Sequence, residues 1–503
     1  MRLPGGAEQV SGMLRGVPLP AVTSWRFATM SYGATQPTTG PRPMIGAAPD
    51  SGQPAPGSGQ LTPGSGQPTP GSGQLTPGSG QPTPGSGQPT PGPTGRAPRE
   101  AASQRLSEVL AALSVLLDAA ERRAEGHAVR TAYIAARIGG ELGLPEERRA
   151  GLLYSGLLSD VGTIGPAADP DADIARVRRS GLSRYRRDAT PAHLSRPLRA
   201  HAVIATLGLP SHVAESIATA DERWDGRGPA HLRGDRIPRD GRLIALAAAV
   251  AGVGTTPAAT DIDRMLRVER GRSLDPGLVD EVLRMGRAGL WAELGEPLVL
   301  DRVLALEPPE TIRWTHDQAL DAVAVAFADV VDTRTPRMGR HSRRVAAFAV
   351  RTGIELGFDA RLQIDLRRAA LLHDIGKLLV PIATLEKPAE LTEAERRVVD
   401  EHARAGAAVL AGSRAFAGLA PLTVAHHERL DGNGMFPALA DDRLALAARV
   451  VALADRYEAM TAVRPYRALL SPQQVWSILD EVVGEPMART ALRALRKAVV
   501  DAQ

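Results

Sequence analysis

Histidine and aspartate residues gather in the part of the chain beyond residue 313. Asp374 and Asp455 lie in the apolar stretches "ALLHDIGKLL" and "RVVALADRYEAM", where an ionised carboxylate is costly to bury unless a cation compensates it. Imidazole and carboxylate ligands suit Mn, Fe, Ni or Zn better than Ca. The set is large enough for two divalent metal ions with Asp374 as the bridge: His341, His373, Asp374, His402, His426, His427 and Asp455.

Some of these histidines also allow an ordinary role. A lone His341 on an apolar helix face could be a core residue with one hydrogen bond, and His402 in the polar "DEHARAG" could be solvated. The pair His426 and His427 can project into one cleft only near a helix end or turn, and the break at 431–434 supplies one.

Lysine is rare enough here to be informative. Only Lys377, Lys387 and Lys497 are lysines among the 60 Lys and Arg residues. Lys377 follows His373 by one helical turn and could place a point charge on a phosphate oxygen. The alternative is a solvated helix end.

The elements that must position these residues read as helices. Between Gly339 and Leu356, one helix face collects His341, Val345, Phe348 and Thr352. Residues 104–124, 362–378, 392–411 and 444–461 read similarly, and no alternating strand pattern of useful length appears. The sequence therefore predicts an all-α fold.

The helical part contains two copies of one unit. "GHAVRTAYIAARIGGELGL" parallels "GRHSRRVAAFAVRTGIELGF", and 33 residues separate His127 from Asp160, as they separate His341 from Asp374. A duplication predicts domains at about 103–292 and 313–503, here called the first and second copy, with "ALEPPET" between them.

The first copy lacks most of the candidate ligands. His127, Asp160 and His201 remain, and Asp225 still marks the turn. The other positions have been replaced, by Ser159, Thr163, Ala220, Asp221 and Ala248. Three leftover ligands cannot build a two-metal centre, so this copy is predicted to be non-catalytic. It could be a packing partner, a dimerising surface, a sensor or a relic.

Composition excludes several classes of protein. The 503 residues have a formal charge of +4, 3% aromatic residues and no cysteine, which argues against a nucleic-acid polymer as partner and excludes disulfides and thiolate metal sites. The unit P-G-S-G-Q-[L/P]-T runs five times from Pro56 to Thr90, so residues 1–102 are predicted to be a disordered tether. No signal peptide or membrane span is evident, which predicts a cytoplasmic protein without membrane contact.

The second copy resembles an HD-GYP domain, the metal-dependent phosphodiesterase branch of the HD superfamily. The matching pieces are H-D-I-G-K at 373–377, H-H-E-R-L-D-G-N-G at 426–434, "KPAELTEAERRVVDEH" and "ARVVALADRYEAMTAVRPYR". The resemblance implies that His341, His373, Asp374 and Asp455 hold one metal. Asp374, His402, His426 and His427 would hold the other, and a water between them would attack phosphorus. It also implies that Asp431, Arg464 and Arg467 contact substrate, although both arginines could be ordinary surface residues.

Three positions depart from the family pattern. Gly434-Met435-Phe436-Pro437 replaces Gly-Tyr-Pro, Arg337 stands where three-metal members carry a glutamate, and Glu458 stands where a second aspartate is usual. The resemblance implies hydrolysis of cyclic di-GMP to pGpG or GMP in bacterial second-messenger signalling. A homodimer stays open, because the first copy could be a dimerising surface. The altered loop keeps another nucleotide open as substrate, and a non-catalytic signalling module is the alternative from a different class.

Overall fold

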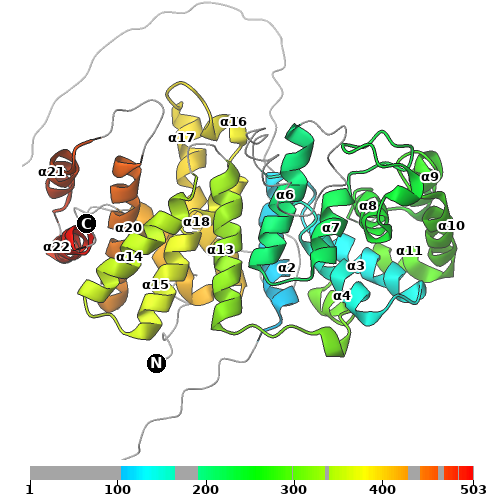
Figure 1. Ribbon diagram of the computed structural model, residues 1–503, viewed down its shortest axis with the longest axis horizontal. Helices are drawn as coiled ribbons and strands as arrows, with labels where there is room; N and C mark the ends of the chain where they lie inside the picture. Colours follow the sequence, from blue (N-terminus) through cyan, green and yellow to red (C-terminus); the bar gives the residue numbers. More distant parts are fainter. Residues whose placement is uncertain are drawn as a thin grey trace, which may run out of the picture. The chain divides into compact units, whose positions relative to one another are not determined.

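The computed structural model describes residues 104–164, 191–255, 257–296, 298–334, 339–428, 442–462, 470–484 and 486–501. Helices make up the regular structure of this part of the chain, with two isolated β-bridges and no strand (Figure 1). The all-α prediction is therefore confirmed. The predicted tether at 1–102 lies outside the described residues.

The helices of the first copy begin with α2, whose sequence is apolar around nearly its whole circumference. The α-helices up to residue 304 are α2 (Leu106–Ala120), α3 (His127–Glu141), α4 (Glu146–Leu157), α6 (Pro191–Thr206), α7 (Ser211–Thr219), α8 (Arg239–Ala251), α9 (Ala259–Glu269), α10 (Pro276–Met285), α11 (Trp291–Gly295) and α12 (Leu300–Leu304). Short turns of helix lie at η2 (Gly234–Arg236), η3 (Gly286–Leu290) and η4 (Pro309–Thr311).

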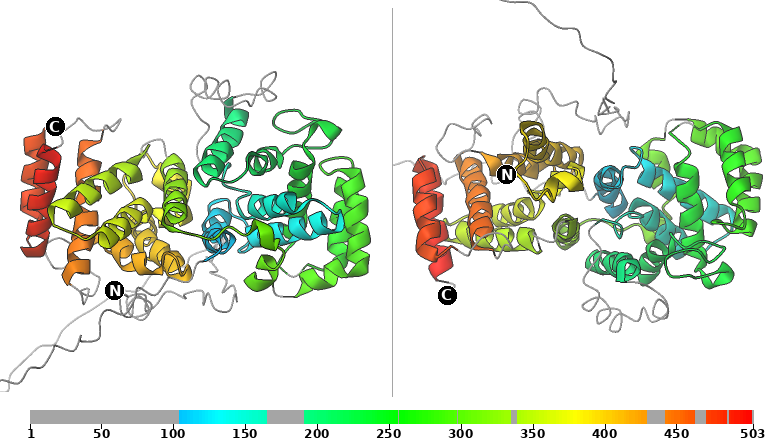
Figure 2. Two further views of the ribbon diagram at one scale, coloured as in Figure 1. Left: turned by 60° about the horizontal axis from the view of Figure 1, so that its bottom comes forward. Right: turned by 90° about the horizontal axis from the view of Figure 1, so that it is seen from above.

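The helices of the second copy include the segments that contain the candidate ligands. They are α13 (Asp317–Arg334), α14 (His341–Glu355), α15 (Ala360–Leu372), η5 (Ile375–Leu379), α16 (Ile382–Leu385), α17 (Glu393–Asp400), α18 (His402–Gly412), η6 (Ala417–Leu419), α19 (Ala420–Val424), η7 (Ala425–His427), α20 (Asp442–Thr461), α21 (Pro472–Val482) and α22 (Pro486–Val500). Helices α14, α20 and α22 pack against one another (Figure 2). No helix in the described ranges is long and apolar enough to cross a membrane.

Helix α2 is buried because both copies pack on it. It contacts α3 and α4 of the first copy and η5 and α18 of the second, which explains why leucines around the helix, Leu110, Leu113 and Leu117 among them, are fully buried. Its start is fixed by the first residue of the second copy, since the backbone N–H of Leu106 donates to the carbonyl of Arg313 at 2.7 Å. The apolar circumference of α2 is thus explained by burial on all sides.

The predicted helix at 339–356 is confirmed as α14, with His341, Val345 and Thr352 buried and Phe348 half-buried on one face. Two other segments that were each predicted as one continuous helix are divided in the structure. The segment 362–378 ends as an α-helix at Leu372 and resumes as η5, and the segment 392–411 is interrupted at Glu401. His373 still has helical dihedral angles, whereas Asp374, with φ −96° and ψ 7°, begins the turn that leads into η5.

A close backbone contact holds η5 against α18. A Cβ atom added at Gly376 would lie 1.9 Å from the carbonyl oxygen of His402 and 2.8 Å from the backbone nitrogen of Gly406. Only glycine at position 376 permits this approach. The contact brings the turn that contains Asp374 next to the first residue of α18, which is His402.

Candidate metal centre

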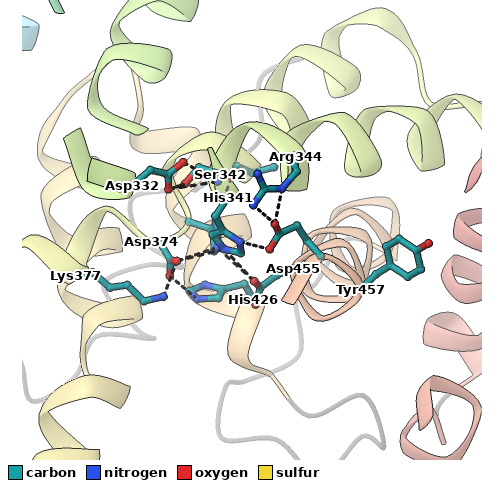
Figure 3. Close-up of polar contacts among 12 residues, drawn as sticks. Asp332, His341, Ser342, Arg344, Asp374, Lys377, His426, Asp455 and Tyr457 are labelled. Carbon is teal, nitrogen blue, oxygen red and sulfur yellow. Dashed lines mark hydrogen bonds and ion pairs between the residues drawn. The ribbon is translucent and has the colours of Figure 1, made fainter. Parts of the chain in front are cut away.

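All seven predicted ligand positions lie together in the second copy, contributed by α14, the α15–η5 turn, α18, η7 and α20. Figure 3 labels four of them, His341, Asp374, His426 and Asp455. Two groups have potential ligand atoms within 4.8 Å of one another: Asp374, His402, His426 and His427 in one, and His341, His373 and Asp374 in the other. Asp374 belongs to both.

The first group of contacts involves one oxygen of Asp374. Its Oδ2 atom lies 3.6 Å from Nε2 of His341 and 3.3 Å from Nε2 of His373. Asp455 on α20 approaches the same two imidazoles, with Oδ1 at 3.3 Å from His341 and 3.7 Å from His373. Two imidazole nitrogens and two carboxylates thus face a common point.

The second group involves the other oxygen of Asp374. Its Oδ1 atom lies 3.1 Å from Nε2 of His402 and 3.7 Å from Nε2 of His426. The Nε2 atoms of His426 and His427 each lie 3.3 Å from Nε2 of His402. The carboxylate of Asp374 therefore has one oxygen on each side, as a bridging ligand requires.

Backbone carbonyls fix the orientation of three of these imidazoles. Nδ1 of His373 lies 2.9 Å from the carbonyl of Ala370, and Nδ1 of His426 lies 2.5 Å from that of Thr423. His402 makes the same bond to Val399. A carbonyl oxygen can only accept, so each Nδ1 donates, and Nε2 is left as the atom that can offer a lone pair to a cation in the centre. The Nε2 atoms of His402 and His426 lie 3.3 Å apart, so both could bind one cation.

The charges of the centre also fit a cation. Nε2 of His373 is buried without a hydrogen-bond partner. Burial with the neighbouring imidazoles keeps the pKa of His426 well below its usual value. Burial opposes ionisation of Asp374, but His373 and Lys377 outweigh it and lower its pKa. Imidazole nitrogens that give up their protons on binding, together with ionised carboxylates, are the donors that divalent transition metals bind.

Lys377 lies beside the same carboxylate. Its Nζ atom is 2.6 Å from Oδ2 of Asp374, and its side chain is 20% exposed. The sequence predicts that an α-helical turn connects His373 to Lys377. In the structure Lys377 lies instead in the 3₁₀ helix η5, which begins directly after Asp374. The ammonium group therefore stands at the edge of the centre and retains access to solvent.

Glu458 is a contact that the sequence analysis noted only as a departure from the family pattern. Its side chain is 1% exposed, and Oε2 lies 2.5 Å from Nδ1 of His341. Arg344 approaches Oε1 of the same carboxylate from one turn further along α14. An orienting carboxylate on the far nitrogen of a metal-binding histidine is a frequent arrangement.

Two further contacts were missed. Asp332 accepts hydrogen bonds from the backbone N–H of Ser342 at 3.0 Å and from its hydroxyl at 2.8 Å, so it caps the start of α14 beside His341. Arg334, buried at the end of α13, donates to the carbonyls of Leu378 and Val380 and braces the end of η5. The sequence does contain a signal for the Asp332 contact. Asp118 precedes His127 in the first copy by the same number of residues as Asp332 precedes His341 in the second.

Several predicted positions lie outside the described residues. They are the substrate-contact candidates Asp431, Arg464 and Arg467, the loop residues Gly434, Met435, Phe436 and Pro437, and Arg337.

The leftover ligands of the first copy do not assemble into a comparable group. Within the described residues, clusters of three or more potential metal ligands occur only in the second copy. Asp160 is buried beside Arg123, with 3.6 Å between Oδ1 and Nη2. His201 bonds the carbonyl of Pro197 through Nδ1 at 2.9 Å.

A model of the HD domain family matches residues 111–263 and 326–486, once in each copy. The chain is 30% identical over 434 residues to 3'3'-cGAMP-specific phosphodiesterase 3 of Vibrio cholerae, which is 78% of this chain and 94% of that protein. It is 30% identical over 167 residues to a cyclic di-GMP phosphodiesterase of Thermotoga maritima, 32% of this chain and 45% of that protein.

A solved structure agrees with these similarities. The crystal structure of a cyclic GMP-AMP specific phosphodiesterase of V. cholerae has a TM-score of 0.55 and 27% identity, covering 79% of this chain and 98% of that one. The family match covers more than half of the sequence, and it includes the ligand cluster in the second copy. The chain therefore belongs to the HD domain family, and it contains that domain twice.

Proposed function

We propose that this protein is a metal-dependent phosphodiesterase that opens a cyclic dinucleotide at one phosphodiester bond. The observation that supports this most directly is the carboxylate of Asp374, whose two oxygens face two separate sets of imidazole nitrogens. A two-metal hydrolytic centre needs such a bridging ligand.

The ligands divide between two cations in this proposal. His341, His373, Asp374 and Asp455 would hold one, and Asp374, His402, His426 and His427 the other. Iron, manganese, nickel and zinc all suit these donors. When bound, such cations supply a nucleophilic water at neutral pH and stabilise negative charge on a phosphoryl group.

The protein's own residues position the reaction. The carbonyl contacts of His373, His402 and His426 hold their rings in one orientation, so no reorientation is needed when substrate binds. Lys377 retains access to solvent and would direct its charge to a non-bridging phosphate oxygen. Hydrolysis then forms a bond from the water oxygen to phosphorus and breaks the bond to the ribose 3′ oxygen, which takes up a proton.

The substrate class follows from the relatives. The 3'3'-cGAMP-specific enzyme matches over most of both chains, whereas the T. maritima cyclic di-GMP enzyme matches about a third of this one. We propose a 3′,5′-linked cyclic dinucleotide, with 3'3'-cGAMP and cyclic di-GMP as the two to compare. Asp431, Arg464 and Arg467 are proposed to contact it.

The experiment uses the full chain purified without chelator. Metal content is measured first, and the protein is then incubated with Mn²⁺ or Fe²⁺ and each cyclic dinucleotide while products are separated by chromatography. We expect about two metal ions per chain and a linear dinucleotide as product. Asp374→Asn should lose metal and activity together, while Asp329→Asn, which removes a surface partner of Arg343, should keep both.

The outcomes separate the alternatives. Bound metal without product from either dinucleotide would contradict the substrate class and retain a hydrolase for another nucleotide. No bound metal and no product would contradict the enzyme and favour the interaction module.

A further inference from the structure

The first copy has a buried carboxylate where the second copy has its bridging aspartate. Asp160 is 3% exposed, and its Oδ2 atom is buried without a hydrogen-bond partner. Arg123 is 3.6 Å from Oδ1, but the side chain of Arg123 is 46% exposed. An ionised carboxylate in such a place needs a buried cation nearby.

Arg196 supplies positive charge at this place. Its side chain is only 14% exposed and contacts the carboxylate of Asp221, and Nη2 donates to the carbonyl of Ser159 at 3.1 Å. By sequence, Ser159 stands at the position of His373 and Asp221 at that of His427. Burial lowers the pKa of Arg196 to about 10, the charge of Asp160 opposes this, and the group stays charged at neutral pH.

The backbone makes room for this arginine. A Cβ atom added at Gly162 would lie 2.8 Å from Cγ and 2.9 Å from the carbonyl oxygen of Arg196. Gly162 occupies the position of Gly376, which in the second copy admits His402. The same close approach therefore brings a metal-ligand candidate to the site in one copy and an arginine in the other.

We propose that the guanidinium group of Arg196 stands in the first copy where the second copy gathers its metal ligands, so that the first copy is a permanently filled, metal-free form of the same domain. The residues left in this copy do not fit a metal centre, because Asp160 and Asp221 face arginines and neither His127 nor His201 belongs to a cluster of three or more potential ligands among the described residues.

This arrangement has a consequence for the second copy. Helix α2 contacts η5, which contains Lys377, and α6, which contains Arg196, contacts α13. Because Arg196 provides the positive charge in the first copy, the positions of α2 and α6 against the second copy should not depend on whether metal is bound. The first copy would therefore serve as a metal-independent support for the turn that contains Lys377.

The experiment is a double-mutant cycle in the full chain, with Arg196→Met, Asp160→Asn and both together. We expect Arg196→Met to lower the Tm by about 5 to 10 °C, equally with metal and with EDTA. Adding Asp160→Asn to Arg196→Met should recover part of the lost Tm, because the double variant no longer buries a carboxylate without its cation. Hydrogen exchange should rise in residues 155–164 and 198–206 and, because α2 packs on η5, also in 370–380.

Controls separate this from general destabilisation. Arg267→Met, on an exposed face of α9, should leave the Tm unchanged, and Arg196→Lys should lose less than Arg196→Met. Strictly additive losses in the cycle would overturn the proposal. So would metal that remains bound in the full chain after Asp374→Asn and His402→Ala remove the second-copy ligands. If Arg196→Met does not fold, the cycle is run with Arg196→Gln, which also removes the charge.

Discussion

His341 on α14 and Glu458 on α20 are joined by a short hydrogen bond, with Nδ1 of His341 2.5 Å from Oε2 of Glu458. The bond leaves Nε2 of His341 directed at Asp374 and Asp455. Burial lowers the pKa of His341, but these three carboxylates outweigh it and raise the pKa to about 11. Glu458 is therefore placed to orient the imidazole rather than to bind a metal itself.

The variant Glu458→Gln should weaken metal binding by about 10- to 100-fold, because an amide orients the ring less firmly and lacks the charge. Titration with Mn²⁺ measures the affinity. Glu355→Gln removes a comparable carboxylate that pairs with Lys497 at 2.6 Å and should leave the affinity unchanged. Equal metal affinity in Glu458→Gln and the parent protein would show that Glu458 does not position His341.

Lys377→Met should lower kcat by about 100-fold or more while KM and metal content change little, since its charge is proposed to act on the reacting phosphate. Lys387→Met is a matched control, because Lys387 also pairs with a carboxylate, Glu395, at 2.6 Å but lies outside the centre. Steady-state kinetics with a cyclic dinucleotide decide the question. A large rise in KM with unchanged kcat would assign Lys377 to substrate binding alone.

Gly376→Ala should disrupt the centre through the backbone. The new methyl group would meet the carbonyl of His402, so η5 must move away from α18 and the 3.1 Å contact between Asp374 and His402 should be lost. We expect lower metal content and a lower Tm. Gly140→Ala on α3, where a Cβ meets nothing within 4 Å, should change neither. Unchanged metal content in Gly376→Ala would show that η5 and α18 can separate without cost to the centre.

The residues of the candidate metal centre could be predicted from the sequence, but the backbone turn that brings some of them together could not. Helical spacing places His341 on a buried face, and that is confirmed, because periodicity reports burial directly. The turn at His373 and Asp374 was read as part of a helix, because its cause is a contact between Gly376 and His402, distant in sequence. Such tertiary contacts leave no periodic signal. The bonds of Glu458 and Arg334 are of the same kind.

Asp118 should make the first copy sensitive to pH. Burial raises its pKa to about 8, assisted by the charge of Asp160 and opposed by the N–H groups of Gly126, His127 and Ala128. Oδ1 accepts from Ala128 at 3.0 Å, while Oδ2 is buried without a partner. The equivalent Asp332 has the hydroxyl of Ser342 as an additional donor, and its pKa rises only to about 6, again through burial.

The direction in which stability changes with pH follows from the raised pKa of Asp118. Between the unfolded value near 3.8 and the folded value near 8, the folded protein holds a proton that the unfolded chain has lost, so stability is greatest at low pH and falls as pH rises through 8. Asp118→Asn keeps an oxygen acceptor and removes the titration. Relative to the parent protein, it should gain about 2 to 4 kcal/mol in free energy of unfolding between pH 5 and pH 9.

Denaturant unfolding of both proteins at several pH values measures this difference, and taking the difference cancels the titration of all other groups. Asp263→Asn, on the exposed helix α9 beside Arg267, should show a flat difference over the same range. A flat difference for Asp118→Asn would mean that Asp118 stays ionised in the folded protein. The buried Oδ2 would then need a cation, and Arg123, whose backbone N–H donates to the carbonyl of Asp118 at 2.8 Å, is the first candidate to test by substitution.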